Sequence, residues 1–265
     1  MERSLTDRSE NRPSGWQAVK LFLQGAVAAL ARDAEAWGLA PGAALALAAM
    51  PVVATLVFVA AIPFPALYLG LVDEDALLEW LQFACILAAG LVFGWLGVRL
   101  ARTGRRGLGA LYALLALGML FVAGEEISWG QRLLGLQTPA ELDAINAQHE
   151  ISVHNIFGFH QAFIYAAMLG GLYGAASPLV KLALPAAWRR SKLAYLLVPP
   201  LCLAPAFFMP FGYRLVRLLF KPELYYPARA FIIVDFAELT ELCLYFAVLA
   251  FGWLILRRAP GREDQ

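Results

Sequence analysis

The sequence predicts an all-α protein with six transmembrane helices, and both composition and the distribution of apolar residues support this fold class. Of the 265 residues, 61% are hydrophobic and only 15% are charged, and the mean hydropathy is +0.65. A soluble domain carries roughly a quarter charged residues, so this chain has too few to cover a surface that faces water. Its apolar residues form runs long enough to cross a bilayer as helices.

The chain divides into four parts, of which the largest is a single transmembrane helical domain. The predicted parts are a polar N-terminal tail (1–15), an amphipathic helix (16–37), the transmembrane domain (38–257) and a cytoplasmic tail (258–265).

The amphipathic helix is predicted from residues that recur every three or four positions, namely Trp16, Val19, Leu23, Val27 and Leu30. This spacing places them on one face of a helix. The apolar part is too short to span a bilayer, so we expect the helix to lie in the membrane interface. A short re-entrant segment is the alternative.

Hydropathy places the six spans at about 43–69, 78–100, 108–124, 156–180, 193–213 and 228–256. Sixteen of the 21 Lys and Arg residues lie in the N-terminal segment, the loops 99–106 and 181–192, and the C-terminal tail. By the positive-inside rule both termini are cytoplasmic. We therefore predict a multi-pass protein of a bacterial inner (plasma) membrane, with residues 125–155 on the outer side.

The fifth predicted span contains four prolines, Pro199, Pro200, Pro205 and Pro210. Proline removes a backbone donor and clashes with the preceding turn, so a kinked or broken helix is expected. The break either lines a cavity or packs as a simple bend.

The sixth predicted span carries Asp235, Glu238 and Glu241 at spacings of three residues. An acidic side chain at the bilayer centre costs about 2.5–3.5 kcal/mol. These three are therefore expected to face the bundle interior, either in a functional site or proton path, or in a structural polar network.

The segment AGEEISWGQR places Glu125 and Glu126 at the end of the third span. A helix from Leu108 to Gly124 is roughly 26 Å long, so both glutamates are expected at the membrane boundary. Adjacent residues on a helix point about 100° apart, so at most one of them need belong to a site. The partner of Arg132 is expected to come from another part of the chain.

The connection after this segment begins with Thr138-Pro139-Ala140-Glu141, which matches a capping box. We expect an outward-facing helix with Leu142, Ile145, His149, Val153 and Ile156 on one face. Glu150 and His154 would then be adjacent at four-residue spacing.

The strings GEEISWGQR and NAQHE…HN, within residues 124–155, together resemble a segment of uncharacterised bacterial multispanning membrane proteins. The resemblance implies a multispanning fold and no particular activity.

Our first functional hypothesis is a membrane-embedded, metal-dependent enzyme that acts on a lipid or lipid-linked substrate at the outer face. The candidate catalytic residues are Glu125, Glu126, His149 and Glu238. The candidate ligands of a divalent metal such as Zn or Fe are His149, Glu150, His154 and Asp235. The candidate phosphate-binding residues are Arg132, Arg214 and Arg217.

Two other hypotheses stay open. A proton-coupled transporter or lipid flippase would use the acids of the sixth span as a proton relay. A non-catalytic subunit of a membrane complex would use small residues at 166–177 to dock a partner helix. Membrane lipids are expected partners, and nucleic acid is not, because no basic block with interleaved aromatic residues is present.

Overall fold

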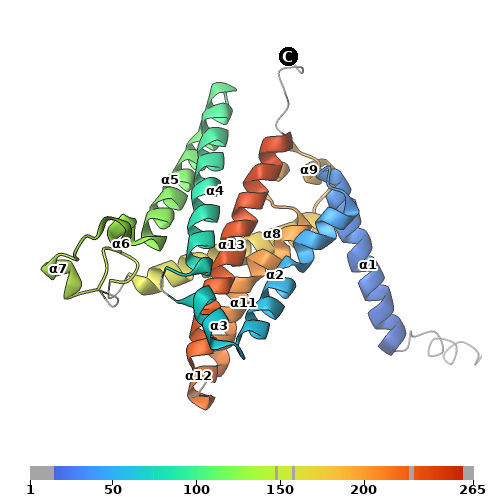
Figure 1. The fold of residues 1–265 in the computed structure, drawn as a ribbon. Coiled ribbons are helices and arrows are strands. Elements are labelled where there is room, and N and C mark those ends of the chain that lie inside the picture. Colours follow the sequence, from blue (N-terminus) through green and yellow to red (C-terminus); the bar gives the residue numbers. More distant parts are fainter. Residues whose placement is uncertain (1–14, 74, 147–148, 157–158, 227–229, 259–265) are drawn as a thin grey trace, which may run out of the picture.

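The computed structural model describes residues 15–73, 75–146, 149–156, 159–226 and 230–258, and it is helical throughout these ranges apart from turns and one isolated bridge between Asn146 and Ile156. No β-strand is present in the described ranges, which confirms the all-α prediction (Figure 1). The predicted tails, except for Gly15 and Arg258, lie outside the described residues.

Seven long helices and several short ones build the molecule. The long helices are α1 (Gly15–Ala36), α2 (Pro41–Ala61), α4 (Leu77–Arg102), α5 (Arg106–Glu126), α8 (His160–Ala183), α11 (Ala204–Phe220) and α13 (Ala230–Arg258). The short ones are α3 (Pro65–Val72), η1 (Ser128–Gly130), α6 (Gln131–Leu134), α7 (Ala140–Asp143), α9 (Ala186–Arg189), α10 (Lys192–Leu197), η2 (Leu201–Leu203) and α12 (Pro222–Tyr225).

Six segments of the described chain are long and apolar enough to cross a membrane, as predicted. Two predicted spans are interrupted. The first is broken between Ala61 and Pro65, so that α2 ends early and α3 begins with a proline in its first turn. The fifth is broken at Pro199 and Pro200, between α10 and η2, which confirms the expected effect of the prolines.

Glycines allow close approach in two helix pairs, α4 with α5 and α8 with α11. A Cβ atom at Gly97 of α4 would lie 3.0 Å from the carbonyl oxygen of Gly109 of α5, so the two backbones touch. In α8, a Cβ atom at Gly171 would lie 2.6 Å from the carbonyl oxygen of Phe207 of α11, and one at Gly174 would lie 2.2 Å from the Phe207 ring. These small residues therefore serve packing within the chain.

The two ends of the bundle differ in what fills them. The α4–α5 turn and the C-terminal end of α13 lie at one end, and α3 and α12 lie at the other (Figure 1). The half toward the α4–α5 turn is filled by a large apolar cluster that includes Phe93, Leu96, Tyr112, Phe251 and Leu254. We call the other half, with the described residues of the α5–α8 connection (127–146, 149–156 and 159), the loop end. It contains the polar side chains of the candidate site.

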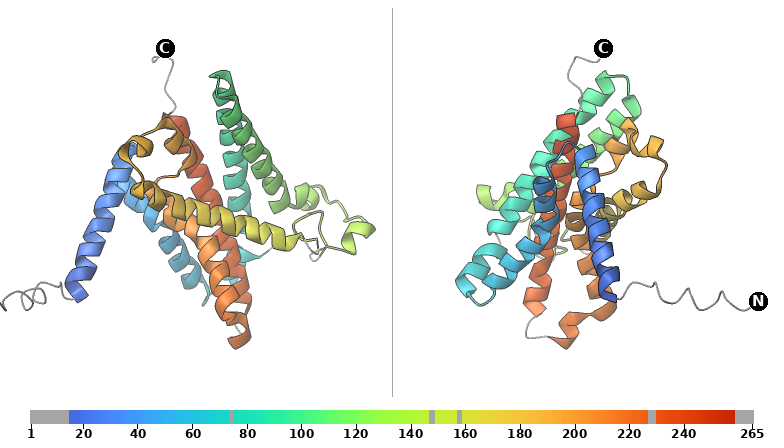
Figure 2. Two further views of the ribbon diagram at one scale, coloured as in Figure 1. Left: turned by 180° about the vertical axis from the view of Figure 1, so that it is seen from behind. Right: turned by 90° about the vertical axis from the view of Figure 1, so that its right-hand side faces the viewer.

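The C-terminal part of helix α1 is fixed to the bundle by a buried aspartate. Asp33 is buried, and its carboxylate accepts hydrogen bonds from Lys181 Nζ (3.3 Å) and the backbone N–H of Leu201 (2.6 Å). The N-terminal part exposes Trp16, Phe22 and other apolar side chains, and it slants away from the bundle (Figure 2, left view). Its placement in the membrane interface stays a prediction.

Candidate functional site

A cavity of about 570 Å³ lies at the loop end, lined by α3, α4, α5, α8, α11, α13 and described residues of the α5–α8 connection. Eight carboxylates from the described part of the chain line it: Asp73, Glu79, Glu125, Glu126, Glu150, Asp235, Glu238 and Glu241. Arg132, Arg214, Arg217, His154 and His160 line it as well. The acids at the end of the third span and those of the sixth therefore share one cavity.

Glu125 is the central acceptor of the connection. One oxygen accepts a hydrogen bond from the Trp129 indole (2.7 Å). The other accepts the backbone N–H groups of Val153 and His154, both at 2.7 Å, and lies 3.1 Å from His154 Nδ1. Because Glu125 is only 2% exposed and has four donors around it, it holds the connection and the His154 ring in place.

The turn after Glu126 is left-handed over three consecutive residues. Ser128, Trp129 and Gly130 have φ angles of 46°, 55° and 77°, which are unfavourable for the first two residues. Two side-chain bonds compensate: Ser128 Oγ donates to Glu150 (2.6 Å), and Trp129 donates to Glu125. The turn thus ends helix α5 at Glu126 and directs the two side chains to different partners.

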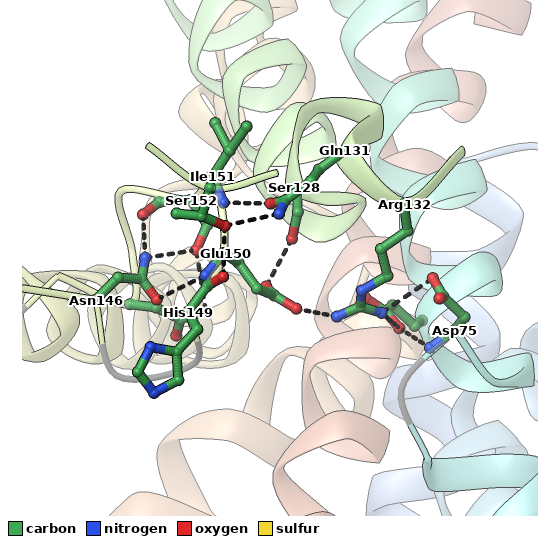
Figure 3. A network of polar contacts seen from close by, with 12 residues as sticks. Asp75, Ser128, Gln131, Arg132, Asn146, His149, Glu150, Ile151 and Ser152 are labelled. Atoms are coloured by element: carbon green, nitrogen blue, oxygen red, sulfur yellow. Dashed lines mark hydrogen bonds and ion pairs between the residues drawn. The ribbon is translucent and has the colours of Figure 1, made fainter. Parts of the chain in front are cut away.

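Arg132 joins the connection to the start of α4 (Figure 3). Its guanidinium group donates to Glu150, and it pairs with Asp75 (3.0 Å) and Glu79 (3.7 Å). Burial alone would lower the pKa of Arg132, but the hydrogen bond and charge of Glu150 outweigh it and raise the pKa above its ordinary value. The expectation that its partner comes from elsewhere in the chain is confirmed, and these contacts place Arg132 in a network of acids rather than free for a phosphate.

The prediction of a long helix after Thr138 is wrong. Helix α7 is a single turn, and no side chain caps it. Thr138 Oγ1 instead accepts from Gln131 Nε2 (2.7 Å) and donates to the carbonyl oxygen of His149 (2.5 Å). Gln131 Oε1 accepts the N–H of Ile151 (2.5 Å), so bonds between distant residues replace the local cap (Figure 3).

His149 therefore does not lie on an apolar helical face. Its backbone is left-handed (φ 61°), its side chain is 72% exposed, and Nδ1 contacts Asp143 (2.9 Å). It does not line the cavity that receives His154 and Asp235. Within the described ranges, no three or more His, Cys, Asp or Glu residues are arranged to hold a metal ion. Of the four candidate ligands, Glu150, His154 and Asp235 line the cavity and His149 does not, so the complete set does not converge.

The three acidic side chains of α13 all face the bundle interior, as expected because exposing a carboxylate to lipid is energetically unfavourable. Asp235 accepts from the Tyr68 hydroxyl (2.7 Å), and Glu238 accepts from Gln82 Nε2 (3.1 Å). Glu241 lies 3.6 Å from an Arg214 nitrogen. On the facing helix, Glu126 accepts from the hydroxyl of Tyr245 (2.8 Å), so Glu125 and Glu126 point to different neighbours.

Sequence reasoning missed Tyr68, Gln82 and Tyr245, which donate to the acids from three helices. A glutamine inside an apolar run is a signal that could have identified Gln82. The tyrosines give no such signal, because tyrosine is common near membrane boundaries.

Six candidate spans, five of which line a cavity with many charged side chains, define the class: an integral, multi-pass helical membrane protein. No match to this chain is found among protein-family models, curated proteins or solved structures. The chemistry of the cavity therefore carries the functional argument.

Proposed function

We propose that the protein is a membrane-embedded enzyme in which His154 is the general base. The observation that carries this proposal is the contact of His154 Nδ1 with the buried carboxylate of Glu125, beside a cavity that His154 lines. A carboxylate at Nδ1 fixes the imidazole tautomer and leaves Nε2 as the proton acceptor. Glu125 is then a positioning residue rather than a catalytic one.

The wall of the cavity formed by α11 and α13 supplies arginines and carboxyl groups. Arg214 and Arg217 line the cavity on α11, and Glu238 and Glu241 line it on α13. Arginine suits a phosphate or carboxylate, and carboxyl groups can return a proton to a leaving group. In this proposal the anionic part of an ester or phosphoester substrate contacts the arginines, and His154 takes a proton from water or a hydroxyl group as its oxygen bonds to the carbonyl carbon or phosphorus. The bond from that atom to the leaving oxygen breaks, and the protonated carboxyl of Glu238 or Glu241 gives the leaving oxygen its proton.

The substrate class follows from the position of the cavity. It lies among membrane-spanning helices, which favours a lipid or lipid-linked substrate. With both termini cytoplasmic, as the distribution of Lys and Arg predicts, the substrate comes from the outer leaflet. No step of the proposal uses a metal ion, because no three of the described His, Cys, Asp and Glu residues are arranged to hold one.

The test compares lipid composition in proteoliposomes made from a bacterial inner-membrane lipid extract, with and without the purified protein. We expect mass spectrometry to show one lipid class converted. His154→Ala should slow that conversion by about 10²–10⁴-fold, the usual contribution of a general base. His149→Ala is the matched control and should keep the activity, since His149 is exposed outside the cavity. Conversion that survives His154→Ala contradicts the proposal.

The excess of carboxylates over arginines around the cavity favours one other function, proton-coupled transport. The cavity is one-sided, since a large apolar cluster fills the other half of the bundle, and a transporter would have to open that cluster. Solute uptake or lipid flipping driven by a pH gradient, and lost in Glu238→Gln, would favour transport over the enzyme.

A further inference from the structure

We infer that an acyl chain of a bilayer phospholipid enters the cavity sideways, between α5 and α8 past Phe163, and lies against α8 below the polar groups. This inference rests on the proposed function and names how its substrate binds.

The cavity wall changes from polar to apolar along α8. His160 lines it first, and Phe163, Ile164 and Ala167 follow at spacings of three, four and seven residues, on one helical face. Val122 of α5 and Leu244 of α13 also line the cavity. A molecule that fills the cavity therefore meets charged groups at one part of the wall and hydrocarbon at another, as an amphiphile requires.

Helices α5 and α8 each pack mainly against a third helix rather than against each other. Helix α5 packs along α4, and α8 packs along α11. The start of α8 lies near the end of α5, and α8 then runs away in another direction (Figure 2). Where they approach each other, the rings of Phe121 and Phe163 stack, with centroids 6.3 Å apart.

Phe163 lies between the membrane and the proposed base. Its ring contacts the His154 ring edge-on (5.9 Å) and lines the cavity, while its neighbour Phe121 is 37% exposed. Phe121 lies about one turn inside the end of α5, which the sequence predicts at the membrane boundary, so lipid hydrocarbon is expected around it. A rotation of one phenylalanine side chain would connect the bilayer to the cavity without separating a packed helix pair.

A phospholipid fits both parts of this wall. Arg214 and Arg217 match its phosphate, and the apolar face of α8 matches its chain. The volume of about 570 Å³ lies within the usual range of small-molecule pockets. It holds the headgroup and part of one chain, with the rest of the lipid left in the bilayer.

The test uses phosphatidylethanolamine with a photoreactive diazirine in its acyl chain, in vesicles of phosphatidylethanolamine and phosphatidylglycerol. Labelled residues of the full-length protein are mapped by peptide mass spectrometry. Labelling at Ile164 is compared with labelling at Leu56, a side chain of α2 that is exposed to the bulk lipid. We expect Ala167→Trp to lower the Ile164 to Leu56 ratio severalfold, because the indole fills the chain site.

Leu169→Trp is the control, since it adds bulk to a side chain of α8 that is 66% exposed and does not line the cavity. It should leave the ratio unchanged. If Ala167→Trp does not give a monodisperse protein, Phe163→Trp narrows the entrance instead and should lower the same ratio. A ratio that neither blocking variant lowers overturns the inference.

The two proposals fail in different ways. An unlabelled cavity together with His154-dependent conversion of a lipid would leave the enzyme in place and overturn the side entrance. A labelled cavity that responds to Ala167→Trp, without any His154-dependent conversion, would leave the lipid site in place and overturn the enzyme.

Discussion

At the residue scale, the adjacent glutamates at the end of α5 have different surroundings. Glu125 receives hydrogen bonds from a tryptophan indole and from two backbone N–H groups, and it also contacts His154. Glu126 receives one bond, from the Tyr245 hydroxyl. A hydroxyl can exchange its donor and acceptor roles, whereas a backbone N–H cannot. The cost of neutralising each glutamate should therefore differ.

Glu125→Gln should destabilise the protein more than Glu126→Gln does. The glutamine NH₂ would face groups that are themselves donors, and each buried donor left without a partner costs about 1–3 kcal/mol. We also expect Glu125→Gln to abolish His154-dependent activity, since the imidazole loses the carboxylate that orients it. Thermal unfolding in detergent and the lipid conversion assay measure the two effects. A larger loss of stability in Glu126→Gln would contradict this account of Glu125.

The pair of Arg132 and Glu150 gives a second prediction at this scale. Removing Arg132 leaves Glu150 buried beside Ser128 without its cation. We expect Arg132→Ala to cost roughly 3 kcal/mol, at the low end for a buried pair because the arginine is partly exposed. In a double-mutant cycle, Glu150→Gln should recover part of this loss. Strictly additive effects in chemical unfolding would show that the two side chains are not coupled.

Residue chemistry explains which site features were predictable. The inward orientation of Asp235, Glu238 and Glu241 follows from the cost of carboxylates in lipid, and the structure has it. The convergence of residues from six helices does not follow from spacing along any one of them. The metal ligand set was proposed from residue types alone, and the position of His149 depends on a loop fold that local patterns do not encode.

At the element scale, the membrane-spanning helices were predicted well from their apolar runs. The helix predicted from the capping box was not. Spans depend on long apolar runs, and the proline break in the fifth span depends on a missing donor. The capping box at Thr138 is a four-residue signal with a small energetic effect. The capping box does not form, because Thr138 and Gln131 instead make several hydrogen bonds across the connection.

The packing of α8 on α11 gives a prediction with a matched control. Gly174→Leu should destabilise the protein by about 1–3 kcal/mol, because its Cβ would lie 2.2 Å from the ring of Phe207. Gly170→Leu, one turn earlier, meets no neighbour within 4 Å and should be neutral or stabilising, since leucine favours a helix over glycine. Thermal unfolding in detergent compares the two. Equal effects would mean that α8 and α11 are not in contact at Gly174.

At the scale of the whole molecule, polar and apolar material are separated along the bundle. The large apolar cluster fills the half toward the α4–α5 turn, and the cavity occupies the loop end. The basic loop 99–106 and the C-terminal end of α13 lie at the end away from α3 and α12 (Figure 1). The hydropathy and the charge distribution of the sequence also predict that this loop and the C-terminal tail lie on one side of the membrane, because an even number of spans returns the chain to the side where it began.

Cysteine labelling tests which end faces outward. Cys202 and Cys243 are buried, and Cys85 is half-buried, so Cys85→Ala gives a background with little reactivity. On this background His149→Cys reports on the loop end and Thr103→Cys on the α4–α5 turn, and both native residues are exposed. If the positive-inside rule holds, a membrane-impermeant maleimide labels His149→Cys in intact spheroplasts and labels Thr103→Cys only after lysis. The reverse pattern would turn the cavity toward the cytoplasm, and the substrate would then have to come from the inner leaflet, although the contacts that orient His154 would be the same.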